Sequence, residues 1–169
     1  MKILFIAPKY TGGIGGHASR VAGKLQEYGF DVKLMHTSHI PIKKLKNTSF
    51  VVFSTLKALV QTENYDIVHA FNVPSAFAMK YTKAKKKILS IHGVYSEQVD
   101  TLHSKTISTA AKITETKVLQ WADKLTTDSK IVKKIYKEKL NVDFLFSCLI
   151  TGESLMISGL VPKITATFI

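Results

Sequence analysis

The chain has 169 residues, 46% of them hydrophobic, so it is long enough to bury a core as one domain and too apolar to be a disordered chain. Its one cysteine, Cys148, excludes an internal disulfide framework and a cysteine-rich zinc site. No uncharged run approaches the length of about 18 residues that crosses a bilayer. The first apolar run is short and precedes Pro-Lys-Tyr, so we expect no secretory signal and a cytoplasmic protein.

The formal net charge of +12 comes mostly from lysines. They cluster at Lys43, Lys44 and Lys46, at Lys80, Lys83, Lys85, Lys86 and Lys87, and at Lys130, Lys133, Lys134, Lys137 and Lys139. Such a charge either serves solubility or attracts an anionic partner, such as an acidic membrane surface or a phosphorylated substrate. Nucleic acid is an unlikely partner, because arginine is nearly absent and no aromatic residues alternate with the lysines.

The first 32 residues have the pattern of a strand, a glycine-rich loop and a helix. The apolar run Lys2–Ala7 predicts a buried parallel strand that stops at Pro8. Residues 11–16 then contain four glycines, and Gly29 is placed to end the following helix. The expected apolar stripe of that helix is Ala18, Val21, Ala22, Leu25 and Tyr28. Bare backbone N–H groups at the start of a helix are well suited to hold a phosphate.

The same loop also allows two other interpretations. Residues 13–18 fit the dinucleotide pattern G-x-G-x-x-G/A, but Pro8–Thr11 separate the glycines from the strand. The second strand, about Asp31–His36, also lacks the acidic residue that would bind a ribose. A nicotinamide or flavin enzyme is therefore disfavoured. The glycines could also serve only a tight turn.

The remaining chain alternates between helical and strand patterns. Further strands are expected at 66–70, 87–91 and 124–127, and helices at 49–63, 75–82 and 106–121, although 50–53 alone could be a strand. The stripe of the helix at 106–121 is Ile107, Ala110, Ala111, Val118 and Trp121. Ser129 can cap a last helix whose apolar face is Ile131, Val132, Ile135 and Tyr136. This alternation predicts an α/β fold, a Rossmann-like parallel sheet with helices on both faces.

Ligands of such sheets bind outside the carboxyl ends of the strands. That rule selects the glycine loop, Thr37, the stretch after His69, and His92. His69 is more readily explained as a structural residue than as a ligand-binding one.

Six short segments carry a family resemblance through their order and spacing. They are Gly12-Gly13-Ile14-Gly15, Gly29-Phe30-Asp31-Val32, Tyr65-Asp66-Ile67-Val68-His69-Ala70, Ile91-His92-Gly93, Ala122-Asp123-Lys124 and Asp128-Ser129. Together they resemble the N-terminal half of a GT-B glycosyltransferase of the large retaining group called family 4. The resemblance covers about residues 1–144, which we interpret as the Rossmann-like, acceptor-side domain.

The resemblance implies transfer of a sugar from a nucleotide-diphosphate donor, with no metal or other cofactor. His92 would line the cleft near the reacting sugar as the catalytic residue, in a positioning and electrostatic role. The implied substrate- and phosphate-binding residues are Gly12, Gly13, Ile14, Gly15, Gly16, His17 and Gly93. The partner would be an acceptor substrate. A lipid-linked acceptor would fit the basic composition and peripheral binding at the inner face of an anionic membrane.

Residues 145–169 depart from the family pattern. This segment is apolar, and its only charged residues are Glu153 and Lys163. We expect that it does not lead into the donor-binding domain of the family. We therefore expect the chain to be incomplete and inactive alone. The tail would reflect an interrupted gene, a split enzyme completed by a second chain, or a natural end that packs on the sheet or on another copy. The alternative function is a non-catalytic phosphate- or nucleotide-binding module.

Overall fold

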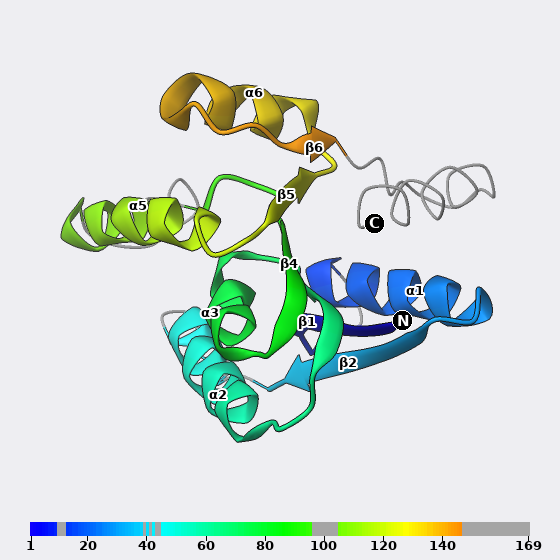
Figure 1. Ribbon diagram of the computed structural model, residues 1–169. Helices are drawn as coiled ribbons and strands as arrows, with labels where there is room; N and C mark the ends of the chain where they lie inside the picture. Colours follow the sequence, from blue (N-terminus) through cyan, green and yellow to red (C-terminus); the bar gives the residue numbers. More distant parts are fainter. Residues whose placement is uncertain (10–12, 39, 41, 43–44, 96–104, 147–169) are drawn as a thin grey trace.

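The computed structural model describes residues 1–9, 13–38, 40, 42, 45–95 and 105–146 (Figure 1). Strands and helices alternate along the chain. The strands are β1 (Lys2–Pro8), β2 (Asp31–Thr37), β3 (Tyr65–Ala70), β4 (Ala84–Ser90), β5 (Lys124–Thr127) and β6 (Leu145–Phe146). The helices are α1 (Gly13–Glu27), α2 (Lys46–Val60), α3 (Val73–Tyr81), α5 (Lys105–Leu119) and α6 (Lys130–Leu140).

The strands form one parallel sheet in the order β2-β1-β3-β4-β5-β6. β1 pairs on one side with β2, where Ile3 faces Val32, and on the other side with β3, where Ile3 faces Ile67. After β2 the chain therefore crosses β1 and adds its later strands on the opposite side. The predicted α/β class with a Rossmann-like parallel sheet is confirmed.

Two hydrophobic cores cover the two faces of the sheet. Alternate residues of β1 point to opposite faces, so Leu4 and Ile6 join one core while Ile3 and Phe5 join the other. The core of Leu4 receives side chains from α2, α3, α5 and α6, and that of Ile3 receives them from α1. Residues 3–7 are each at most 3% exposed, which explains why β1 is a continuous apolar run.

Local capping agrees with the sequence at the start of the last helix and at the end of the first. The Ser129 hydroxyl accepts a hydrogen bond from the backbone N–H of Val132 at 3.2 Å, as the sequence predicts for an N-cap. Asn141 ends α6 in the left-handed region, with φ of 51°. Gly29, which has φ of 82°, follows the end of α1 and allows the turn into β2.

Several sequence expectations about packing are wrong in detail. Tyr28 is 54% exposed because α1 ends at Glu27, before the stripe reaches it. Ile131 is 72% exposed because Val132 and Tyr136 already fill the buried side of α6. Ala110 is exposed on α5, whereas Ala111 and Val118 are buried. The strand alternative for residues 50–53 is also wrong, since they belong to α2.

The end of the sheet extends past the family-like region predicted from the sequence. β6 begins at Leu145 and pairs in parallel with β5, where Thr126 faces Leu145. The predicted apolar tail lies, from residue 147 onward, outside the described residues.

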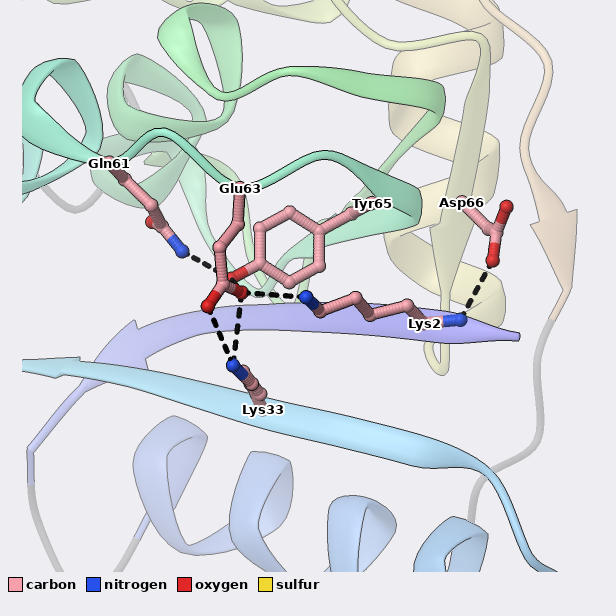
Figure 2. A network of polar contacts seen from close by, with 6 residues as sticks. All are labelled: Lys2, Lys33, Gln61, Glu63, Tyr65 and Asp66. Carbon is pink, nitrogen blue, oxygen red and sulfur yellow. Dashed lines mark hydrogen bonds and ion pairs between the residues drawn. The ribbon is translucent and has the colours of Figure 1, made fainter.

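A polar network links the amino ends of β1, β2 and β3 (Figure 2). The carboxylate of Glu63 accepts from Lys2 Nζ of β1 at 2.9 Å and from Lys33 Nζ of β2 at 2.8 Å. The Tyr65 hydroxyl of β3 also donates to it, at 2.9 Å, and in turn accepts from the Gln61 amide. These contacts lower the pKa of Glu63 to about 2. One carboxylate therefore links three strands at the edge where the chain enters them.

We expect Glu63→Gln to lower the melting temperature by a few degrees at low salt and by less at high salt, because screening weakens exposed ion pairs. The matched control is Glu27→Gln, which breaks only the exposed pair between Lys24 and Glu27 within α1. Thermal unfolding followed by circular dichroism measures both. Equal shifts for the two variants would show that Glu63 is an ordinary surface acid.

Candidate functional site

The first part of the site is the amino-terminal end of α1. This helix begins at Gly13, whose φ of 55° favours glycine, and its first turn contains no acidic residue. Gly15 and Gly16 are buried, so their backbone lies against the protein without a side chain between. The partial positive charge of the helix end is not offset by a local carboxylate, which suits it to an anion. Gly12 lies outside the described residues.

The second part is an acid–histidine pair beyond the ends of β4 and β5. His92 Nδ1 lies 3.1 Å from the Asp128 Oδ2 atom, and the His92 side chain is 18% exposed. A carboxylate can only accept, so we assign the proton to Nδ1. The Nε2 atom then presents a lone pair, and it is buried with no hydrogen-bond partner among the described residues. His92 Nε2 can therefore accept a hydrogen bond from a hydroxyl group of a ligand.

His17 joins these two parts. It lies on the second turn of α1, and its ring meets that of His92 edge to face at 5.5 Å between centroids. Its Nε2 is likewise buried without a partner in the described chain. Burial is the main cause that lowers the pKa of His17, and the nearby His92 ring lowers it further. His17 is therefore neutral at physiological pH, and its unsatisfied ring nitrogen lies beside the helix end.

A second row of polar side chains runs across the neighbouring strands β3, β4 and β5. His69 Nε2 and the Ser90 hydroxyl are 2.6 Å apart, and Ser90 is 2.6 Å from the Thr126 hydroxyl. The His69 ring also stacks on Phe71, with centroids 4.2 Å apart. Burial lowers the pKa of His69 to about 3, so the ring stays neutral. Its partners Ser90, Phe5 and Phe71 all belong to the protein, so we interpret His69 as a structural residue.

The structure thus brings together most of the residues selected from the sequence. Gly13, Ile14, Gly15, Gly16 and His17 lie at the start of α1, and His92 and Gly93 lie past β4 beside them. Thr37 is buried at the end of β2, on the far side of β1 from His92. Sequence reasoning missed Asp128 as a site residue. The sequence places Asp128 just past a predicted strand, but only the pairing of β5 with β4 shows that this strand lies next to the one that precedes His92.

Other parts of the described chain offer weaker candidates. A shallow hollow lined by Asn64, Tyr65, Asp66, Lys83, Ala84 and Lys85 lies at the amino ends of β3 and β4, opposite the histidines. Two of its three charged groups pair with each other, since Lys85 Nζ lies 2.7 Å from the Asp66 carboxylate, so we assign the hollow no ligand. Among the described residues there is no cluster of three or more metal-binding side chains and no helix long and apolar enough to cross a membrane.

Comparison with known families identifies the class of protein. The sequence model of Glycosyltransferase Family 4 matches residues 11–144, a range that contains α1, His17, His92 and Asp128. The chain belongs to this family, and glycosyl transfer is the activity that the family suggests. No curated protein matches the sequence significantly.

The neutral, largely enclosed His69 makes stability depend on pH. Its folded pKa lies below the ordinary value of 6.5, so the unfolded chain binds a proton that the folded chain excludes. The free energy of unfolding should therefore have its full value above about pH 6.5. It should fall toward pH 3 by roughly 1.4 kcal/mol per pH unit from this one group.

His69→Gln can keep a hydrogen bond to Ser90 but cannot titrate, so we expect it to flatten the slope of stability between about pH 6.5 and 4.5. Glu63, whose ordinary pKa of 4.5 is lowered, loses its contribution only below that range. Urea unfolding at a series of pH values measures the slope. An unchanged slope in this range would contradict the assignment of His69 as a buried neutral group.

Proposed function

We propose that the carboxyl edge of the sheet takes part in transferring a sugar from a nucleotide-diphosphate donor to an acceptor. The observation that carries this proposal is the convergence of two histidine nitrogens, on His17 and His92, at the amino-terminal end of α1, where neither has a partner among the described residues. Glycosyl transfer needs groups that bind the sugar hydroxyls, and beside them groups that stabilise the negative charge of the diphosphate. The carboxyl edge of the sheet combines both kinds of group.

Each group has a separate role in the proposal. The first backbone N–H groups of α1 face the diphosphate, whose negative charge grows as the sugar leaves. His92 Nε2 accepts a hydrogen bond from a hydroxyl of the reacting sugar, and Asp128 keeps the imidazole in the tautomer that can do so. The contact between His17 and His92 limits the movement of both rings. Positioning of this kind contributes through lost freedom of the reactants as well as through charge.

The chain supplies the acceptor side in this proposal, and a second domain or a second chain supplies the remaining donor contacts. A lipid-linked acceptor suits the net charge of +12, because its phosphate groups are anionic. A non-catalytic phosphate-binding module is the second candidate, and the helix end without acidic residues supports it equally.

Weak binding of a nucleotide-diphosphate sugar tests both candidates, and saturation-transfer NMR can measure it on the whole chain. We expect Gly15→Val to remove binding of the sugar nucleotide and of the free nucleoside diphosphate, because Gly15 is buried and an added side chain displaces the backbone amides at the start of α1. His92→Ala should weaken the sugar nucleotide about tenfold and leave the free nucleoside diphosphate unchanged, since it contacts only the sugar. Asp128→Asn should also weaken binding of the sugar nucleotide and leave the free nucleoside diphosphate unchanged, but the loss should be smaller than in His92→Ala.

Gly23→Ala is the control for Gly15→Val, since it lies on the same helix and an added Cβ meets no atom within 4 Å. It should bind as the unaltered chain does. Equal losses of both ligands in His92→Ala would favour the non-catalytic module. Absence of any nucleotide binding in the unaltered chain would reject both candidates.

A further inference from the structure

Glu115 is a carboxylate in the apolar stripe of α5. It lies on the helix between Ala111 and Val118, and all three side chains are buried, with Glu115 only 3% exposed. A buried carboxylate is costly unless hydrogen bonds replace the water that it loses, and an apolar side chain at this position would avoid that cost. Packing of the helix alone therefore does not account for a glutamate here, so its hydrogen bonds need an explanation.

The carboxylate of Glu115 accepts hydrogen bonds from two other segments of the chain. Its Oε1 atom accepts from the backbone N–H of Tyr95 at 2.9 Å, and the Tyr136 hydroxyl donates to the same oxygen. The Tyr136 bond joins α5 to α6, whereas the Tyr95 bond joins α5 to the turn that follows β4. The second of these two contacts reaches the candidate site, because His92 lies in that turn.

The turn that carries His92 is held at both of its ends. On one side, the backbone N–H of Ile91 donates to the Thr126 carbonyl at 2.9 Å, beside the pairing of β4 with β5. On the other side, the N–H of Tyr95 is bound by Glu115. The backbone bends at residues 92 and 93, between these two anchors. Because only three residues separate the anchors, the Glu115 bond limits where the His92 ring can lie.

We propose that Glu115 is a positioning residue for His92. By holding the turn through Tyr95, it keeps Nδ1 of His92 at the 3.1 Å separation from Asp128 that fixes the tautomer, so that Nε2 stays an acceptor. The purpose of this positioning rests on the proposed function, since the hydroxyl that binds Nε2 is that of the reacting sugar. Glu115 itself touches neither the donor nor the acceptor in this proposal.

The tautomer of His92 gives a readout that needs no ligand. At mildly alkaline pH, long-range nitrogen–proton correlation spectra of the unaltered chain should show the ring proton on Nδ1, and the spectrum of His92→Ala assigns the signal. Glu115→Met keeps the length of the side chain but removes both acceptor oxygens. We expect the Nε2–H tautomer to appear as well in this variant, because the ring is no longer held against Asp128.

Two conservative variants complete this measurement. Glu115→Gln keeps an oxygen that can accept from the Tyr95 N–H, so it should retain the spectrum of the unaltered chain. Glu115→Asp keeps the charge but draws the carboxylate back by one methylene, so it should shift the tautomer in the same direction as Glu115→Met and by less. It also tests the proposal if Glu115→Met does not fold. A tautomer that neither Met nor Asp at this position changes would overturn the proposal.

Tyr136→Phe is the matched control, because it removes the other hydrogen bond of the same carboxylate. The new ring can keep the contact that buried Tyr136 makes with Phe144. This variant should lower the melting temperature and leave the His92 tautomer unchanged. Equal disturbance of the tautomer in Tyr136→Phe and Glu115→Met would assign the carboxylate to helix packing and overturn the proposal. Circular dichroism establishes which variants keep the fold.

Ligand binding tests whether the positioning serves the proposed function. Glu115→Met should weaken the sugar nucleotide about fourfold, less than His92→Ala does, and leave the free nucleoside diphosphate unchanged. If Glu115 acts only through His92, combining the two substitutions should weaken binding no further than His92→Ala alone. Equal losses of both ligands in Glu115→Met, or additive losses in the double variant, would overturn the proposal.

The two proposals fail in different ways. A chain that binds no sugar nucleotide but changes its His92 tautomer in Glu115→Met would keep Glu115 as a positioning residue and reject the proposed function. Selective binding of the sugar nucleotide, together with a tautomer that Glu115→Met leaves unchanged, would keep the proposed function and reject the role of Glu115.

Discussion

The double pairing of β1 is the constraint on which the rest of the structure depends. β1 is buried on both faces and takes β2 on one side and β3 on the other. The crossovers on its two sides therefore leave toward opposite faces, α1 to one and α2 and α3 to the other. At the carboxyl end of β1 this separation leaves the start of α1 beside the ends of β3 and β4, which is where α/β proteins bind ligands.

The chemistry of the site depends on two buried ring nitrogens, of His17 and His92, that have no hydrogen-bond partner among the described residues. Two rows of polar groups cross the sheet on the face covered by α1, with His69, Ser90 and Thr126 in the inner row. Every member of that row satisfies another, so the inner row costs little to bury. The outer row consists of His92 and Asp128, and it differs because Asp128 satisfies only one nitrogen of His92. A buried group left with one unused acceptor is costly unless a ligand or water completes it.

The opposite edge of the sheet shows what a purely structural polar cluster looks like. Glu63 is contacted by Lys2, Lys33 and Tyr65, so its carboxylate has several partners within the protein. Its surroundings favour the charged form, whereas those of His17 favour the neutral form. The two edges thus divide their roles: one holds strands together, and the other holds groups with unused hydrogen-bonding capacity.

Much of this could be predicted from the sequence, for reasons that are local. The run Lys2–Ala7, the glycines before α1 and the Ser129 cap each determine their own conformation through burial, backbone freedom or a side-chain hydrogen bond. Asp128 could not be assigned to His92 in this way, because their contact depends on the register of β5 against β4. The exposed face of α2 was also hidden, since an apolar sequence does not tell which of its sides the sheet covers.

Backbone amide mapping by NMR tests the central claim most directly, because it locates a ligand without assuming an activity. On addition of a nucleotide-diphosphate sugar to the whole chain, the amides of Gly13–His17, His92 and Gly93 should shift together. Those of residues 64–66 and 83–85, which line the hollow at the other edge, should stay in place. Shifts confined to that hollow, or spread evenly over the lysine-rich surface, would contradict a binding site at the carboxyl edge of the sheet.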